Sequence, residues 1–331
     1  MRRFADQHPV LTFLLLAYAI AWILWLPGLL ISHGHLLSFG GIGIYSPAVA
    51  GMILSFQGTR RSGSSVRPRL ILFIVTISIA AVVAVLGMNR RAQPLLSPQI
   101  VVVALLTSAI AAWIVSGADS RDRGVRDYLR TLVHPDRWIW PFIAVASFAL
   151  YLALPAALMH VLGRPVLSTQ SNQGSALWPW LPIVFAYTFF FGGGVSEEPG
   201  WRGFMLAKLQ LKHSPLVASL AVWVAWALWH APIDYSDWVG RSISGYLQIR
   251  VLKLLPLTIL MTWLYNRSHK AILTTALFHT AFNTLPDYLS SASWQLWVLY
   301  GWTATVVITD RMWAAPSVCE PIRSMWFRMN D

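Results

Sequence analysis

The chain of 331 residues holds 25 Lys and Arg residues against 13 Asp and Glu, so charged residues make up 11% of it and hydrophobic residues 56%. Because soluble globular proteins carry about 25% charged residues, this composition excludes a soluble fold, a disordered chain and a disulfide scaffold. What remains is an all-α polytopic membrane protein whose apolar exterior faces lipid. Its glutamates are confined to Glu197, Glu198 and Glu320, so two of them are adjacent.

Apolar stretches long enough to span a bilayer recur along the chain. The first, Val10 to Ile31, is longer than the apolar core of a signal peptide, about 7–15 residues, and lacks a small-residue cleavage site. We therefore interpret it as the first transmembrane helix of a bundle of about 8–10 spans. In chain order, the predicted helices cover residues 10–32, 39–57, 69–88, 98–116, 138–162, 178–196, 215–233, 247–265, 271–288 and 294–309.

The basic residues predict how these helices are oriented. With the N-terminus in the cytoplasm, ten spans place 19 of the 25 Lys and Arg residues on the cytoplasmic side, as the positive-inside rule favours. We expect an integral, multi-pass protein of a bacterial plasma membrane with both termini cytoplasmic. Since basic clusters with stacking aromatics are missing, we expect the lipid bilayer and no nucleic acid as a partner; the oligomeric state is unknown. The single cysteine, Cys319, excludes an intramolecular disulfide and a Cys-based zinc cluster.

The adjacent Glu197 and Glu198 follow an apolar run and three glycines. A carboxylate at membrane depth costs roughly 2.5–3.5 kcal/mol on insertion scales, so it needs a cavity and a partner. Arg202 lies four positions after Glu198, where the two can pair on one helical face, and Glu197 is left for another task. The alternative is an interfacial Glu–Arg pair that only anchors a helix end. The mixed segment Gly200–Lys212 predicts an amphipathic helix at the cytoplasmic interface.

Three more polar side chains stand on later apolar segments. His230 closes one span, where an interfacial role is the simpler interpretation. His279 lies in the middle of the next-but-one apolar segment, and Asn283 follows four residues later on the same helical face. Such groups need hydrogen-bond partners inside the protein, and packing between helices would also satisfy them.

Together these residues can activate water. A Glu poised by burial or by a His can act as general base, while a His and an Asn can donate to the oxyanion formed on a scissile carbonyl. Alternatively, Glu197, His230 and His279 could hold a divalent metal such as zinc. The residues leave these two alternatives open, and in both the reaction is peptide-bond hydrolysis. Neither H-E-x-x-H nor G-x-S-x-G is present.

At this point the motifs resemble a known family. The run Glu197-Glu198-Pro199-Gly200-Trp201-Arg202 is similar to the E-E-x-x-x-R motif of the CPBP family. This family comprises CaaX proteases and bacteriocin-processing intramembrane proteases and includes the type II CaaX prenyl endopeptidase. His230 matches the second motif, and His279 with Asn283 matches H-x-x-x-N. One departure is Trp226, where a Phe is common, which bears on cavity shape and substrate size.

The resemblance implies a role for each matched residue. Glu197 with His230 would activate water, His279 with Asn283 would form the oxyanion site, and Glu198 with Arg202 would shape and balance the pocket. The resemblance covers roughly Leu181 to Leu285. With the predicted helices, we expect three regions: N-terminal transmembrane helices of unknown role in 1–137, a catalytic transmembrane core in 138–309 with its motifs in 197–283, and a cytoplasmic tail in 310–331. The substrate would be a membrane protein or peptide.

Two other classes of function remain open. A transporter could use intramembrane Glu, His and Arg as a proton relay or solute site, although no inverted repeat is visible and the polar groups gather in one half. A non-catalytic immunity or scaffold protein could retain the same helices. Hydrolysis of membrane peptides, or solute flux, discriminates between these classes.

Overall fold

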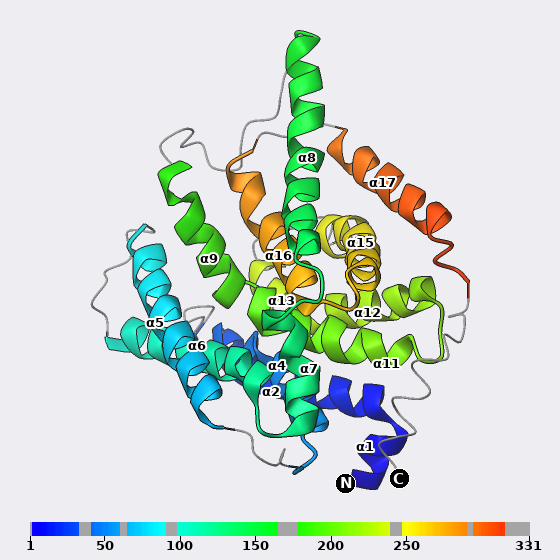
Figure 1. The fold of residues 1–331 in the computed structure, drawn as a ribbon. Helices are drawn as coiled ribbons and strands as arrows, with labels where there is room; N and C mark the ends of the chain where they lie inside the picture. The colour runs from blue at the N-terminus through cyan, green and yellow to red at the C-terminus, as the bar shows by residue number, and fades with distance from the viewer. Residues whose placement is uncertain are drawn as a thin grey trace.

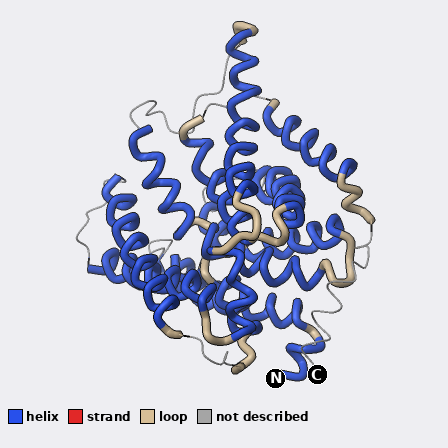
Figure 2. Tube along the Cα trace, in the orientation of Figure 1, coloured by secondary structure: helices blue, strands red, loops and turns tan. Residues whose placement is uncertain are grey.

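The computed structural model describes residues 2–32, 41–59, 65–90, 98–164, 178–238, 247–289 and 294–314. Within these ranges the regular elements are helices, joined by short loops (Figure 2), so the all-α prediction is confirmed. Most of the predicted tail lies outside the described residues, as do Cys319 and Glu320. The longer elements are α2 (Pro9–Ser32), α4 (Ser46–Ser55), α5 (Arg67–Arg90), α6 (Pro98–Ser116), α7 (Arg123–Val133), α8 (Ile139–Val161), α9 (Leu181–Phe191), η3 (Pro199–Leu206), α12 (Pro215–Trp229), α13 (Ala231–Trp238), η4 (Leu247–Lys253), α15 (Leu254–Arg267), α16 (Ile272–Thr284) and α17 (Gln295–Thr309).

Six helical stretches among the described residues are long and apolar enough to cross a membrane, as an integral multi-pass protein requires. Two shorter apolar helices, Gly41–Ser55 and Pro215–Trp229, accompany them. The predicted spans 271–288 and 294–309 form α16 and α17, with 13 and 15 residues. At 1.5 Å per residue, α16 is therefore shorter than its predicted span, whereas α17 matches its span to within one residue. The six long stretches are Pro9–Pro27, Arg67–Gly87, Val101–Asp119, Ile139–Val161, Trp178–Leu209 and Leu247–Arg267.

The centre of the bundle is α16, which packs against α8, α9 and the short helix α10 (Gly194–Glu198) (Figure 1). The apolar residues Ala276, Phe278 and Ala281 of α16 are fully buried. Because α16 is surrounded on these sides, His279 lies inside the protein, whereas Asn283, near the end of the helix, is exposed. This position explains how a helix can carry a histidine at membrane depth.

The N-terminal helices share the interior of the bundle with the rest of the chain. On α2, the hydroxyl of Tyr18 donates to the carbonyl of Ala225 at 2.5 Å, and the indole of Trp22 donates to the carbonyl of Trp229 at 3.1 Å. Where η3 meets α4, a Cβ on Gly200 would lie 2.3 Å from a backbone atom of Pro47. Residues before 60 therefore pack directly on the segment that carries the motifs.

Two local predictions differ from the structure. The segment after Glu198 is the π-helix η3, in which Trp201 and Arg202 are fully buried, so the prediction of an interfacial amphipathic helix is wrong. Arg202 can be buried because its guanidinium is paired with the carboxylate of Glu198 inside the protein. Conversely, α7 occupies a stretch that we expected to be only a connection, and Asp122 caps it by accepting from the backbone N–H of Val125 at 3.0 Å.

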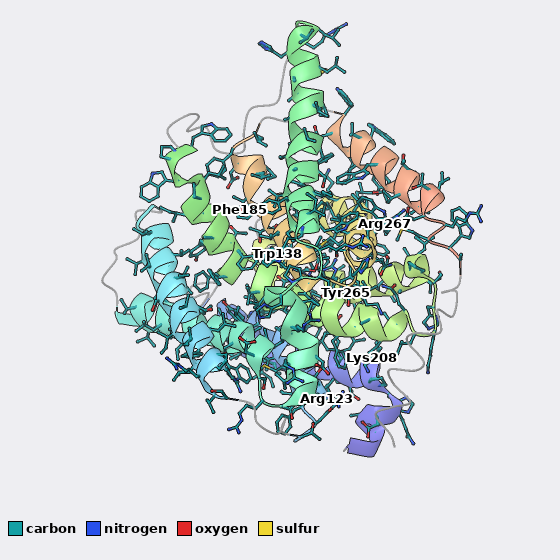
Figure 3. The ribbon with its side chains drawn as sticks, viewed as in Figure 1. Arg123, Trp138, Phe185, Lys208, Tyr265 and Arg267 are labelled. Carbon is teal, nitrogen blue, oxygen red and sulfur yellow. The ribbon has the colours of Figure 1, made fainter. Side chains whose placement is uncertain are left out.

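The last described helices are joined at their ends. Tyr265 on α15 is buried, whereas Arg267, two residues later, reaches the surface (Figure 3). Its guanidinium makes two hydrogen bonds to the carboxylate of Asp310, at 2.6 and 2.5 Å. This pair fixes the end of α17 against α15.

Candidate active site

The adjacent glutamates follow a tight turn between α9 and α10. Gly193, in this turn, has a φ of +112°, a value that residues with a Cβ rarely adopt. A Cβ at this position would also lie 2.4 Å from both Cε1 and Nε2 of His279. Glycine is therefore required twice, for the turn and for the close approach of the imidazole to the backbone.

We predict that Gly193→Ala destabilises the protein and displaces His279. Backbone strain alone costs about 1–3 kcal/mol, and a displacement of about 1 Å at a catalytic group can lower the rate about 100-fold. Thermal unfolding and peptide hydrolysis measure the two effects. The matched control is Gly163→Ala, because Gly163 also has a positive φ, +63°, but no atom within 4 Å of its would-be Cβ. Equal losses of activity in both variants would contradict the contact with His279.

Glu198 is the centre of a buried ionic cluster. Its Oε1 accepts from Nη1 of Arg202 at 2.8 Å and from Nδ1 of His279 at 2.7 Å. Glu198 and Arg202 are fully buried and His279 is 2% exposed. Because a carboxylate that is paired with a guanidinium only accepts hydrogen bonds, Nδ1 of His279 carries the hydrogen, and Nε2 is the nitrogen available for chemistry. The Glu198–Arg202 contact is the one that the i, i+4 spacing predicts.

Glu197 has a different partner. Its Oε2 accepts from the indole N–H of Trp226 at 2.6 Å, and the residue is 5% exposed. Its other oxygen makes no hydrogen bond to the described part of the chain. Glu197 also interacts electrostatically with His279. The structure thus holds a second buried carboxylate by one oxygen and leaves the other oxygen available.

Trp226 contacts most of the predicted site residues. Its ring meets the ring of His279 edge-on at 5.1 Å between centroids, the ring of His230 lies 6.0 Å away, and Cζ of Arg202 lies over it at 4.5 Å. The sequence indicated only that a Trp changes the size of the cavity. The signal for more is that a buried indole N–H needs an acceptor, and an unpaired carboxylate on another span can provide it.

We predict that Trp226→Phe lowers kcat about tenfold or more with a smaller change in KM, because a hydrogen bond to a charged group is worth about 1.5–3 kcal/mol. The ring is retained, but Glu197 loses the N–H that orients it. Steady-state hydrolysis kinetics separate the two parameters. Trp223→Phe is the matched control, since its indole donates to the backbone carbonyl of Arg250 at 2.8 Å rather than to a site residue. An unchanged kcat in Trp226→Phe would show that this bond does not position Glu197.

His230 and Asn283 complete the set of predicted residues. Nδ1 of His230 lies 2.8 Å from the carbonyl oxygen of Trp226, which can only accept, so Nδ1 carries the hydrogen and Nε2 is an acceptor. Asn283 donates from Nδ2 to the carbonyl of Gly192 at 2.9 Å and is exposed. Within the described ranges, neither residue is hydrogen-bonded to Glu197.

One ion pair beside the site was not predicted. Arg250 on η4 makes two hydrogen bonds to Asp234 on α13, at 2.8 and 2.9 Å. The charge of Arg250 acts on both Glu197 and His230. Asp234 directly follows the predicted helix 215–233 and Arg250 lies within the predicted helix 247–265, and their separation of 16 residues gives no helical spacing that would reveal the pair.

The zinc alternative requires Glu197, His230 and His279 to converge on one point. Among the residues that the structure describes, no three His, Cys, Asp or Glu side chains form a group that could hold a metal ion. This arrangement of side chains therefore does not fit a three-residue zinc site.

Comparisons with known proteins agree with the motifs. Residues 178–285 match the family model described as type II CAAX prenyl endopeptidase Rce1-like. Over 123 residues the chain is 27% identical to CAAX prenyl protease 2 of Methanococcus maripaludis, an alignment that covers 34% of this chain and 42% of that protein. The matched segment contains all six predicted site residues. The resemblance to the CPBP family of CAAX proteases is thus confirmed for residues 178–285. The alignment covers less than half the length of this relative.

Proposed function

We propose that the protein is an intramembrane endopeptidase in which Glu197 activates the attacking water. The observation that carries this proposal is the contrast between two adjacent buried carboxylates. Glu198 is paired with Arg202 and His279, whereas Glu197 is held by a single neutral donor. A carboxylate without a cation in direct contact is the better proton acceptor of the two.

In the proposed reaction, Glu197 accepts a proton from water as the water oxygen bonds to the scissile carbonyl carbon. Nε2 of His230 accepts the second hydrogen bond from this water and orients it, because its Nδ1 is fixed to a backbone carbonyl. When the C–N bond breaks, Glu197 returns the proton to the leaving amine. The water is consumed, and each product is released with its ordinary terminus.

The oxyanion formed on the carbonyl is stabilised by His279 and Asn283. If His279 is an imidazolium, its charge and that of Arg202 balance the two carboxylates, and its Nε2–H is a charged donor. Asn283 has a second amide hydrogen besides the one donated to Gly192. Donors that are fixed before the reaction contribute most when they are buried, as His279 is.

The substrate class we propose is a membrane-associated protein or peptide. The relative from Methanococcus maripaludis is named CAAX prenyl protease 2, so a peptide with a CAAX C-terminus is the first substrate to assay. Elemental analysis of the purified protein measures metal content directly, and inhibition by chelators would favour a metal-dependent reaction over the one written here.

The test is hydrolysis of membrane peptides by the purified full chain in liposomes, with cleavage sites read by mass spectrometry. We expect His279→Gln to abolish cleavage, whereas His213→Gln, on an exposed histidine, leaves it intact. Equal cleavage in both variants would overturn the assignment. If solute flux rather than cleavage is present and is lost in His279→Gln, the transporter alternative is correct. The complete absence of both activities would favour the scaffold alternative.

A further inference from the structure

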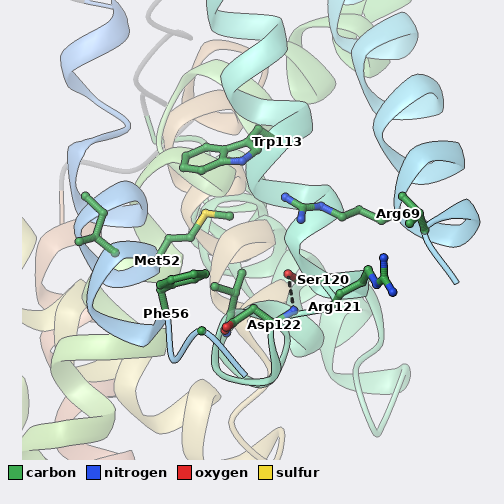
Figure 4. Close-up of a pocket in the computed structure, with 11 residues that line it drawn as sticks. Met52, Phe56, Arg69, Trp113, Ser120, Arg121 and Asp122 are labelled. Carbon is green, nitrogen blue, oxygen red and sulfur yellow. Dashed lines mark hydrogen bonds between the residues drawn. The ribbon is translucent and has the colours of Figure 1, made fainter. Parts of the chain in front are cut away.

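A cavity lies apart from the site residues, between α4, α5, α6 and the start of α7. Its volume is about 640 Å³, within the range of about 300–1,000 Å³ typical of small-molecule sites. Figure 4 shows Met52 and Phe56 on one side, Arg69 and Arg121 on the other, and Trp113 above them. None of these residues belongs to the proposed protease site, so this inference is independent of the proposed function.

One wall of this cavity is apolar and open. Met52 and Phe56 come from the C-terminal end of α4, and Trp113 comes from the last turns of α6. Phe56 and Trp113 are exposed at 55% and 39%. Large exposed apolar side chains in a concave surface favour an apolar ligand.

The opposite wall is cationic. Arg69 and Arg121 are each partly buried, and neither makes a salt bridge or hydrogen bond through its guanidinium to any described residue. For Arg121 the Nε atom is buried without a partner. A guanidinium that is partly removed from water and lacks a carboxylate is stabilised by an anion that it can bind with two nitrogens.

The acidic side chain in the cavity is engaged elsewhere. Oδ1 of Asp122 accepts from the backbone N–H groups of Gln57 and Val125, at 3.3 and 3.0 Å, while Oδ2 is buried and has no hydrogen-bond partner among the described residues. Asp122 therefore serves as the cap of α7 and does not pair with either arginine. Two cations against one carboxylate leave the cavity with a net positive charge.

The cavity also lies at one end of two stretches that are long and apolar enough to cross a membrane. Arg69 is in the first turn of the spanning stretch Arg67–Gly87, and Arg121 follows the end of Val101–Asp119. These two stretches belong to α5 and α6, which pack side by side. The start of one and the end of the other therefore lie at the same bilayer boundary. Lipid phosphates are found at this depth, and basic pockets between transmembrane helices bind their headgroups.

We propose that this cavity binds an anionic glycerophospholipid. Its phosphate would lie between Arg69 and Arg121, and the first part of an acyl chain would cover Met52, Phe56 and Trp113. The combination of charge and apolar surface favours a whole lipid over free phosphate, which would leave the apolar wall uncovered. The occupant is thus a structural or regulatory lipid rather than a substrate of hydrolysis.

The experiment is native mass spectrometry of the full chain released from nanodiscs made of phosphatidylcholine with and without phosphatidylglycerol. We expect phosphatidylglycerol to be retained on the unmodified protein, and retention to fall roughly ten- to thirtyfold in the double variant Arg69→Gln/Arg121→Gln, since each arginine near the surface attracts anionic lipid. Arg123→Gln is the matched control, because Arg123 lies on the neighbouring α7, is exposed and faces Asp127 at 3.9 Å. Circular dichroism checks that each variant is folded.

A second measurement does not depend on the variants. A photoactivatable phosphatidylglycerol should label the peptide that contains Met52 and Phe56 in the unmodified protein, and glycerol 3-phosphate should not compete with it. Unchanged lipid retention in the folded double variant, or labelling only at other helices, would overturn the proposal. Equal displacement by inorganic phosphate would instead identify a free-phosphate site and would also overturn it.

Discussion

Replacing Glu197 with glutamine should lower kcat for peptide hydrolysis about 10²- to 10⁴-fold, the contribution typical of a general base. Glutamine keeps the size of the side chain, and its amide oxygen can still accept the indole hydrogen bond from Trp226, which is 2.6 Å long in the structure. What it loses is the ability to take a proton from water. The measurement is steady-state hydrolysis of a membrane peptide, with thermal unfolding recorded for the same preparations.

The control for this experiment is the same chemical change elsewhere. Glu320→Gln lies beyond the segment 178–285 that matches the family, and we expect it to leave hydrolysis unchanged. If Glu197→Gln retains full activity while its fold is intact, another group accepts the proton. His279 and His230 would then be the groups to examine.

Replacing Arg202 with methionine should destabilise the folded protein by about 3–5 kcal/mol, because it leaves the carboxylate of Glu198 buried without its main countercharge. Both residues are fully buried and 2.8 Å apart. The double variant Glu198→Gln/Arg202→Met should recover a large part of this loss, since it removes the unpaired charge. Denaturant unfolding of the unmodified protein, the single variants Glu198→Gln and Arg202→Met, and the double variant, all in the same detergent, gives the coupling energy.

A surface pair provides the contrast. Arg130 and Asp136 are 3.3 Å apart, with side chains 53% and 45% exposed, and such pairs are worth about 0–1 kcal/mol. Arg130→Met should therefore change stability far less than Arg202→Met. Additive effects in the Glu198 and Arg202 cycle would contradict a direct interaction and would place the cost of Arg202→Met in lost packing instead.

Much of the helical layout could be predicted from the sequence because apolar runs with polar ends leave few alternatives. The predicted helix 98–116 coincides with α6, and 10–32 differs from α2 by one residue. The predicted helix 294–309 also differs from α17 by one residue. The end of α16 was less predictable, because the predicted span ran to 288 whereas the helix ends at Thr284 and a 3₁₀ turn follows. The π-helix η3 was missed since Pro199 predicts a boundary, whereas Glu198 keeps a helical φ of −61° before it.

The site was predictable where spacing within one helix determines the contact, as for Glu198 with Arg202. It was not predictable where the contact joins separate spans. The bond from Trp226 to Glu197 and the pair of Asp234 with Arg250 depend on how helices rotate and approach one another. Sequence positions 29 and 16 residues apart carry no information about that rotation.

The hydrogen bonds from Tyr18 and Trp22 have a consequence for modularity. Their acceptors are carbonyls of Ala225 and Trp229 on the helix that leads to His230. Residues 178–285, which match the family model, therefore receive hydrogen bonds from residues that lie outside this segment. A fragment trimmed to residues 178–285 would lose both donors together with the α4 surface that covers Gly200. Chimeras that exchange the first helices between relatives would have to carry these donors with them, because the N-terminal region packs on the helix that leads to His230.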